Sequence, residues 1–268
     1  MVKLHIDAYG LLARIRAQKP VVHHLTNWVT IYDCAQIVKV LGGSPVMAHA
    51  REEVAEMAGI ASALVLNIGT LTPDLVASMK LAAASANRKG IPVVLDACGA
   101  GATKLRDRAC FELLQETRID IIKGNASEVA RISGEAVRTK GVDAAEVHQD
   151  LREVARKVAE SYKCTVAITG RDDVVADGAR CFIIQNGHPW LTHVVGTGCM
   201  AASTIGAFAA VEADLALAAS SALVCFEVAA EMAAQEAGGP GTFKERFFDR
   251  LFHLDKQTID ERQRVVAG

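Results

Sequence analysis

The chain has 268 residues, of which 51% are hydrophobic and 22% are charged. This composition excludes a disordered protein, and the length is sufficient for a domain with a substantial hydrophobic core. Lysine and arginine total 29 against 31 aspartates and glutamates, which gives a formal charge of -2. Because no basic excess is present to bind a phosphate backbone, the composition argues against a nucleic-acid partner.

The apolar stretches of the sequence predict no membrane span. The longest uncharged stretches cover 199–211 and 215–226, and Glu212 and Asp214 separate them. Neither reaches the roughly 18 residues that a membrane helix needs. The first residues contain no apolar signal core, and the seven cysteines include no Cys-x-x-Cys pair, which is typical of reduced thiols. We therefore expect a cytoplasmic protein.

Short apolar runs alternate with helical patterns along the chain. The predicted strands lie at 63–68, 92–96, 119–123, 165–169, 174–176, 179–185 and 193–195. The predicted helices lie at about 73–88, 104–116 and 142–162, and over 199–235 with a break near 212–214. This alternation is typical of an α/β fold with a mainly parallel sheet covered by helices on both faces. No linker or repeat interrupts the pattern, so residues 1–268 are predicted to form one domain.

Two helix starts have recognisable capping residues. Thr72, followed by Pro73, predicts the beginning of one helix, and Gly90 predicts its end. Asn125 and Glu128, three residues apart, have the spacing of a capping box in which asparagine replaces serine or threonine.

Glycines, hydroxyls and a few charges follow the predicted strands. They occur in segments 67–70, 96–103, 123–128, 169–173 and 196–199. In an open α/β sheet, ligands bind beyond the carboxyl ends of the strands. The sequence therefore predicts a ligand site where these segments meet.

The most informative of these segments is Gly196-Thr197-Gly198-Cys199, which precedes a strong helical pattern. Glycines let the backbone amides approach an anion, and a helix N-terminus adds partial positive charge, so the segment predicts a pocket for a transferring phosphoryl group. A tight turn without a ligand would have the same sequence. Cys199 is a candidate base or nucleophile because the helix dipole favours its thiolate; a small buried residue is the alternative.

Charged side chains follow two further strands. Asp96 ends an apolar run, where a carboxylate is costly unless it is paired or metal-bound; a turn-capping aspartate is the alternative. Lys123, Asn125 and Glu128 bring a cation, an amide and a carboxylate to the end of the next strand. Glu128 fits both a capping box and a magnesium site, and Cys98 is interpreted as a packing residue. No P-loop and no Gly-x-Ser-x-Gly motif is present.

Taken together, these motifs resemble those of the hydroxyethylthiazole kinases, thiamine-salvage enzymes of the ribokinase-like superfamily. The matching segments follow the family's order at 26–30, 42–47, 66–71, 95–96, 99–103, 123–128, 168–170, 195–199 and 239–243. Cys199 after Gly-Thr-Gly is particularly specific, because related ribokinase-like enzymes usually carry aspartate there.

The resemblance implies a ribokinase-like three-layer α/β/α fold. It also implies ATP- and Mg²⁺-dependent phosphorylation of the hydroxyethyl group of 5-(2-hydroxyethyl)-4-methylthiazole. The family is similarly known as a homotrimer with its substrate site at a subunit interface. We therefore expect residues 27–47 and 196–199 to come from neighbouring subunits.

The resemblance also assigns the binding residues. By motif, Met47 and Gly196 would contact the thiazole alcohol, with Asn27 and Gly69 close by. Lys123, Thr169 and Asn125 would contact ATP.

By the same resemblance, Asp96 and Glu128 would lie in the magnesium and phosphate region. Gly196, Thr197 and Gly198 would form the anion hole, and Cys199 would occupy the base position. We expect the electrostatic contribution to exceed base catalysis, because an ordinary thiol is only a small fraction thiolate at pH 7.

Two positions depart from the family pattern. Ala97-Cys98 replaces the usual Pro-Val after the strand-end aspartate, and Lys123 replaces the usual arginine. Lysine lacks the guanidinium fork, so phosphate geometry is expected to be looser without a change of reaction.

Two other functions predict different residues at these positions. A hydroxymethylpyrimidine kinase or a nucleotide-dependent hydrate dehydratase on the same fold would be expected to carry aspartate at position 199. A non-catalytic nucleotide-binding protein would have no need to keep Asp96, Lys123 and Glu128 together.

Overall fold

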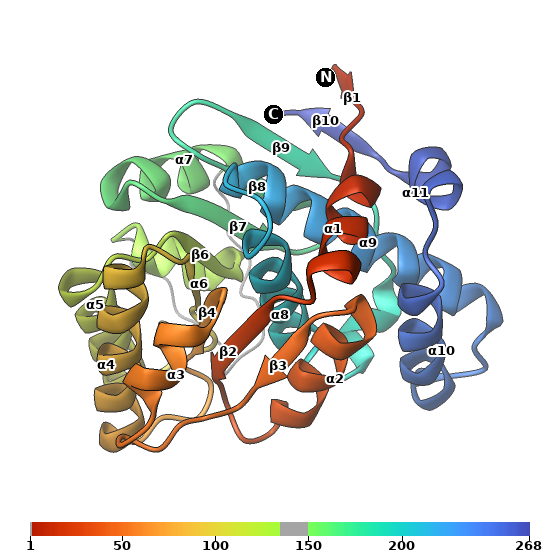
Figure 1. Cartoon of the computed structure of the whole chain (residues 1–268). Coiled ribbons are helices and arrows are strands. Elements are labelled where there is room, and N and C mark those ends of the chain that lie inside the picture. The colour runs from red at the N-terminus through yellow and green to blue at the C-terminus, as the bar shows by residue number, and fades with distance from the viewer. Residues whose placement is uncertain (1, 135–149) are drawn as a thin grey trace.

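The computed structural model describes residues 2–134 and 150–268 (Figure 1). Within these residues one sheet of ten strands has the order β1-β10-β9-β8-β7-β6-β5-β4-β2-β3. The strands are β1 Lys3–Leu4, β2 Val21–Leu25, β3 Ser44–Val46, β4 Ala63–Asn67, β5 Val93–Asp96, β6 Ile121–Asn125, β7 Thr165–Thr169, β8 Asp173–Ala176, β9 Cys181–Ile184 and β10 Val265–Ala267. From β3 to β7 neighbouring strands pair in parallel, and from β7 to β1 they pair antiparallel.

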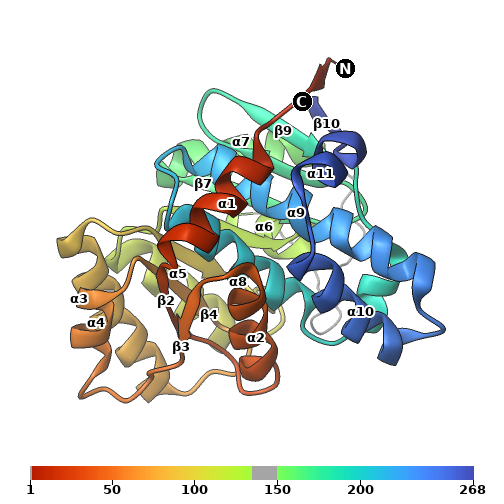
Figure 2. The same ribbon diagram turned by 45° about the vertical axis from the view of Figure 1, so that its right-hand side comes forward.

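Helices cover both faces of this sheet (Figures 1 and 2). One hydrophobic core lies against α1 Ala8–Gln18, α2 Ile31–Leu41, α8 Thr197–Ala209, α9 Leu215–Glu236, α10 Pro240–Phe252 and α11 Lys256–Arg262. The other lies against α3 Val54–Ile60, α4 Pro73–Lys89, α5 Lys104–Glu116, α6 Ala126–Ile132 and α7 Leu151–Tyr162. The arrangement confirms the expected three-layer α/β architecture with a mixed, mainly parallel sheet.

Strand β4 shows how the sequence builds two cores from one sheet. All five of its residues are buried. Ala63 and Val65 belong to the core beneath α8, whereas Leu64 and Leu66 belong to the core beneath α4. Successive side chains of a strand point to opposite faces, so a strand covered on both sides must be apolar throughout. The uninterrupted apolar residues 63–66 are therefore the pattern that such a strand requires.

The predicted capping residues begin and end helices as expected. Thr72 accepts a hydrogen bond from the amide of Leu75 at 3.1 Å at the start of α4. Gly90, with φ +79°, ends α4 in the left-handed region that favours glycine. Asn125 and Glu128 form the complete capping box at the start of α6.

Two predictions of secondary structure need correction. Residues 193–195 do not form a strand, because the short 3₁₀ helix η1 Pro189–His193 leads directly to the start of α8. His188 caps η1 and Pro189 is suited to its first turn, so local chemistry favours a helical turn there. The helix predicted over 142–162 begins at Leu151, where Asp150 is the N-cap. Residues 142–149 lie outside the described residues.

Helix α9 also corrects the sequence-based estimate of apolar length. It is 22 residues long and, by length and composition, apolar enough to cross a membrane, although it contains Glu227, Glu231 and Glu236. However, 78% of its most apolar 18-residue window is buried inside the protein. Such burial is typical of the core helix of a three-layer fold, and the helix is weak evidence for a membrane span.

Candidate active site

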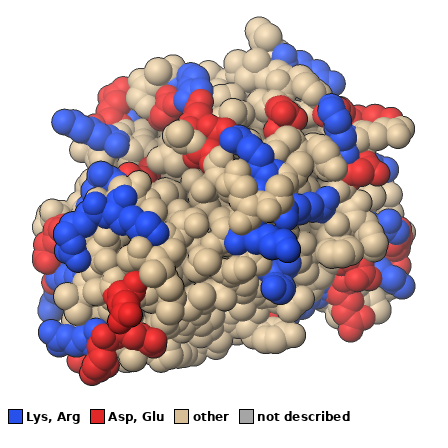
Figure 3. Space-filling model, viewed as in Figure 1, with Lys and Arg blue, Asp and Glu red and all other residues tan. Residues whose placement is uncertain are grey.

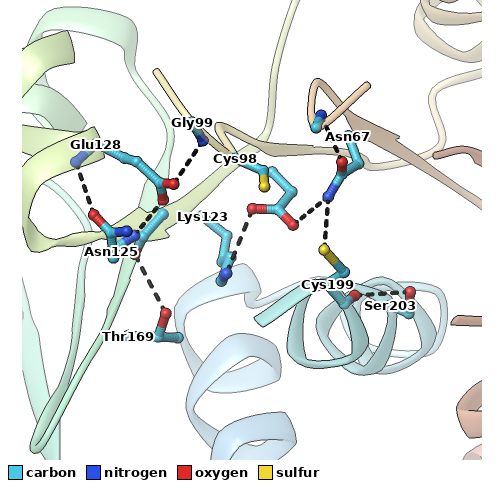
Figure 4. A network of polar contacts seen from close by, with 12 residues as sticks. Asn67, Cys98, Gly99, Lys123, Asn125, Glu128, Thr169, Cys199 and Ser203 are labelled. Carbon is cyan, nitrogen blue, oxygen red and sulfur yellow. Dashed lines mark hydrogen bonds and ion pairs between the residues drawn. The ribbon is translucent and has the colours of Figure 1, made fainter. Parts of the chain in front are cut away.

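The carboxyl ends of β2, β4, β5, β6 and β7 lie along one edge of the sheet, and the N-terminus of α8 points toward it (Figures 1 and 4). The expected residues that lie at or just beyond these strand ends are Asn27, Gly69, Asp96, Asn125 and Thr169, and Lys123 lies two residues before the end of β6. Met47 follows β3 at the outer end of the same edge. Parallel pairing has therefore brought together segments that are distant in the sequence.

Three polar residues stand in register on adjacent strands. Asn67 pairs with Asp96, and Asp96 pairs with Lys123. The fully buried carboxylate of Asp96 accepts a hydrogen bond from Asn67 Nδ2 at 2.5 Å and pairs with Lys123 Nζ at 3.4 Å (Figure 4). Burial opposes the charge of Lys123, yet the attraction of Asp96 and Glu128 raises its pKa above the ordinary value. Lys123 is thus a charged group held at the site.

Cys199 lies in the first turn of α8, with 8% of its surface exposed. Its sulfur accepts hydrogen bonds from Asn27 Nδ2 and Asn67 Nδ2, each at 3.3 Å. A hydrogen bond with the Cys98 thiol lowers the pKa of Cys199 against the effect of burial, and the charge of Lys123 lowers it further.

The glycines before Cys199 leave room for their neighbours. Gly196 has φ +92°, and a Cβ there would lie 2.4 Å from Cγ2 of Thr30. A Cβ on Gly198 would lie 3.0 Å from Lys123 Nζ, so the ammonium group sits close to the helix N-terminus. The backbone amides of α8 and the lysine together form a positive site suited to a phosphoryl group.

Thr197 has a structural use for its side chain. Its Oγ1 donates a hydrogen bond to the carbonyl of Leu191 at 2.9 Å, which ties the start of α8 to η1. Any contribution of Thr197 to an anion hole would therefore come from its backbone amide.

Glu128 joins two strand-end loops. Its Oε1 accepts a hydrogen bond from the amide of Gly99 at 2.7 Å, and its Oε2 accepts one from the amide of Asn125 at 2.6 Å (Figure 4). Burial raises the pKa of Glu128 to about 7, and the charge of Lys123 opposes that shift. The capping function left open by the sequence is thus present, and a magnesium function remains a prediction.

Asn125 and Thr169 end the neighbouring strands β6 and β7. The Asn125 Oδ1 accepts hydrogen bonds from the amide of Glu128 at 3.0 Å and from Ser127 Oγ at 2.8 Å, so this oxygen holds the start of α6. Thr169 Oγ1 lies 3.5 Å from the carbonyl of Gly124 at the end of the neighbouring strand (Figure 4).

The donor set fits magnesium held mainly by ligands from outside the protein. Within residues 2–134 and 150–268, no three His, Cys, Asp or Glu side chains converge to form a metal cage. Mg²⁺ usually retains waters and takes one or two carboxylates together with substrate phosphates. Asp96 at the end of β5 and Glu128 in the first turn of α6 provide two such carboxylates beside Lys123 and the N-terminus of α8.

Residues 27–30 and 196–199 meet within one chain, which corrects the expectation that these two segments come from neighbouring subunits; a contribution of Met47 to a shared site stays a prediction. Asn27 contacts Cys199, and Thr30 packs against Gly196, in the same molecule. The reason is topological: β2 lies beside β4, and α2, which follows β2, packs against α8.

Asn67 is the site residue that sequence reasoning missed. Its Nδ2 donates to both Asp96 and Cys199, and its Oδ1 accepts hydrogen bonds from Asn27 Nδ2 at 3.0 Å and from the amide of Gly69 at 2.8 Å. It ends a buried strand beside Gly69, and that position was the signal that could have identified it.

Known structures share this architecture. A ribokinase-like superfamily protein from Enterococcus faecalis superimposes with a TM-score of 0.63 at 13% identity, over 92% of this chain and 97% of that one. The chain therefore has a ribokinase-like fold.

The family follows from sequence. The model of the hydroxyethylthiazole kinase family matches residues 12–257, and the chain belongs to that family. A hydroxyethylthiazole kinase of Methanosarcina mazei is 52% identical over 95% of this chain and 97% of the relative. A hydroxyethylthiazole kinase structure from Pyrococcus horikoshii OT3 superimposes with a TM-score of 0.89 at 39% identity, over 97% of this chain and 98% of that one. The resemblance read from the motifs is thus confirmed.

Proposed function

We propose that this chain transfers the γ-phosphoryl group of ATP to the hydroxyethyl oxygen of 5-(2-hydroxyethyl)-4-methylthiazole, in thiamine salvage and biosynthesis. Membership of the kinase family and the names of its relatives support this substrate. The observation that carries the proposal is the convergence of Lys123, Asp96 and Cys199 at the N-terminus of α8. A coupled assay for ADP release tests it: the thiazole alcohol should support turnover, and hydroxymethylpyrimidine should not.

The chain's main contribution would be to place and neutralise charge. Phosphoryl transfer requires little covalent chemistry from the protein, so positioning and electrostatics dominate. The amides at Gly196–Gly198 and the ammonium of Lys123 would face the charge that grows on the transferring group. Asp96 keeps Lys123 charged, since the pair is buried together.

Cys199 would face the alcohol. Asn27 and Asn67 donate hydrogen bonds to its sulfur, which stabilise the thiolate or fix the direction of the thiol. Because little proton transfer is needed early in a dissociative reaction, Cys199 would accept the alcohol proton late or only hold the hydroxyl in place. Met47, Asn27 and Gly69 would border the thiazole ring.

Asp96 and Glu128 would hold Mg²⁺ together with the nucleotide. The metal, when bound, neutralises phosphate oxygens and orients them. Both oxygens of each carboxylate are already engaged by the protein, which fixes the directions of their remaining lone pairs. Lys123, Thr169 and Asn125 would border ATP on the same side.

Asp96→Asn is expected to lower turnover by roughly 10²-fold and to raise the magnesium concentration required for half-maximal rate. The amide keeps the size of the carboxylate but loses its charge toward the metal and Lys123. Rates are measured over a magnesium titration, with circular dichroism to check folding. Asp74→Asn, an exposed aspartate in the first turn of α4, is the control. A normal rate and titration for Asp96→Asn would show that Asp96 is only a turn residue.

We further propose a homotrimer whose interface borders the site. Four large apolar side chains beside the site are exposed: Trp28 (50%), Val29 (68%), Tyr32 (74%) and Val195 (71%). In Figure 3 a broad area without charged side chains covers the lower centre of the view, over β2 and β3. Exposed apolar side chains such as these four are typical of a protein interface.

Tyr32→Glu is expected to destabilise the trimer by about 2 kcal/mol or more and to lower activity at nanomolar protein concentration. A carboxylate placed in an apolar interface loses its hydration without a partner. Light scattering coupled to gel filtration measures the mass. Leu105→Glu, an exposed leucine on α5 at the opposite face of the sheet, is the control. A monomeric parent protein that is fully active would contradict the interface proposal.

We also propose that the whole chain forms one domain in the cytoplasm. The pairing of β1 with β10 joins the two ends of the chain into the same sheet, which supports one domain. The proposed use of Cys199 as a reduced thiol supports a reducing compartment.

A further inference from the structure

Arg106 joins the loops that follow β4 and β5. It is the third residue of α5 and is half-buried. Its Nη1 donates to the carbonyls of Ile68 at 2.8 Å and Cys98 at 3.0 Å, and its Nη2 donates to the carbonyl of Gly69 at 2.6 Å. One guanidinium group thus fixes three peptide carbonyls on two different loops.

The fixed peptides lie beside the polar network of the site. Ile68 and Gly69 directly follow Asn67, and Cys98 lies two residues after Asp96. Gly69 is held from both sides, because its carbonyl accepts from Arg106 and its amide donates to Asn67 Oδ1 at 2.8 Å. The position of Arg106 therefore sets the backbone from which the Asn67 and Asp96 side chains reach each other and Cys199.

The loop after β5 is shaped to receive the guanidinium. Gly99 has φ +78°, and a Cβ there would lie 2.7 Å from Arg106 Nη1. The amide of the same glycine donates to Glu128, which also binds the amide of Asn125. Arg106 and Glu128 consequently tie the loops after β4, β5 and β6 together in series.

The partners of Arg106 distinguish it from a surface ion-pairing residue. In the described part of the chain no carboxylate lies within ion-pair distance of it, and its hydrogen-bond acceptors are the three carbonyls. Lysine, which lacks the planar fork, could not reach three carbonyls in this geometry. Arg108 on the same helix is exposed and provides a natural comparison.

We propose that Arg106 is a positioning residue for the phosphoryl transfer: by fixing the loops after β4 and β5 it aligns Asn67 and Asp96 with Cys199 and holds Gly69 against the alcohol. The inference rests on the proposed function for its kinetic consequences. Its structural consequence, the restraint of Cys199, is independent of the substrate.

The kinetic test compares Arg106→Met, Arg106→Lys and the control Arg108→Met. For Arg106→Met we expect kcat to fall by roughly 10²-fold and KM for the thiazole alcohol to rise, because small displacements of catalytic groups are that costly. KM for ATP should rise less than KM for the thiazole alcohol, since Lys123 and Thr169 lie on β6 and β7, which the side chain of Arg106 does not contact. Arg106→Lys should be intermediate, and Arg108→Met should match the parent.

The second readout is the rate at which iodoacetamide alkylates Cys199, followed by mass spectrometry of its peptide. Loosened loops should expose this buried thiol, so Arg106→Met should react several-fold faster, while Arg108→Met should not.

Unchanged kinetics and unchanged alkylation in Arg106→Met would overturn the inference, as would an equal rise of KM for both substrates. If Arg106→Met does not fold, Arg106→Lys decides on the same measures. If the parent lacks thiazole kinase activity, the proposed function fails, and the alkylation rate alone decides the role of Arg106.

Discussion

Replacing Lys123 by methionine is expected to lower turnover by roughly 10²–10³-fold, the cost of removing one preorganised charge from a developing anion. The ammonium lies beside Gly198 at the N-terminus of α8 and pairs with buried Asp96. Methionine keeps the aliphatic length but removes the charge. Single-turnover rates at saturating ATP and magnesium measure the chemical step, separately from any change in nucleotide binding.

The control for this variant must separate lost catalysis from lost stability. Lys123→Met leaves the Asp96 carboxylate buried without its cation, and breaking a buried pair costs about 3–5 kcal/mol. The double variant Lys123→Met with Asp96→Asn removes that unpaired charge and should recover thermal stability without recovering turnover. Lys123→Arg restores the cation that the family pattern favours and should keep the reaction. A stable, fully active double variant would remove Lys123 from the mechanism.

The central strands were predictable because their sequence signals are local. The runs at 63–68, 92–96 and 165–169 are apolar on both faces, and capping residues such as Thr72 and Gly90 mark the adjoining helix. These signals do not depend on what the segment contacts. The strands that lie between the two helical layers were therefore predicted within a few residues of their positions in the structure.

The outer strands escaped prediction because their signals are not local. In β2 the apolar pattern is interrupted by His23 and His24, which are buried and hydrogen-bonded to the carbonyls of Ala48 and Val22. Strand β3 has only three residues and contains Pro45. Strands β1 and β10 pair across the whole length of the chain. A propensity argument contains no information about such long-range partners.

The sequence predicted which strand ends lie together, but not which side chains contact one another there. The rule that ligands bind beyond strand ends located Asp96 and Lys123, and the structure brings both to one edge. The bridging function of Asn67 depends on its register with Asp96. The clamp of Arg106 depends on how a helix approaches two loops. The register of neighbouring strands and the packing of a helix against two loops are properties of the three-dimensional structure, which sequence motifs do not contain.

Replacements of Cys199 are expected to separate proton handling from electrostatic stabilisation. Cys199→Ala removes the thiol but leaves the α8 amides in place, so turnover should fall by up to roughly 10²–10⁴-fold if the thiol is a general base. We expect a much smaller loss, because Lys123 and the amides provide the main stabilisation. Cys199→Asp should retain or raise activity, since a carboxylate is ionised at pH 7 and Asn27 and Asn67 would donate to it as they do to sulfur.

The dependence of turnover on pH between 6 and 9 tests whether the group at position 199 acts in its deprotonated form. A base acts when deprotonated, so if Cys199 is the general base, turnover of the parent should rise with pH through the pKa of Cys199 and then level off. The hydrogen bond with Cys98 and the charge of Lys123 lower that pKa. The pH at which turnover rises should therefore lie below the ordinary pKa of a thiol. Cys199→Ala and Cys199→Asp should both lack this rise, because neither titrates there. Circular dichroism checks folding. A folded, inactive Cys199→Asp beside an unimpaired Cys199→Ala would show that no group at position 199 handles the proton.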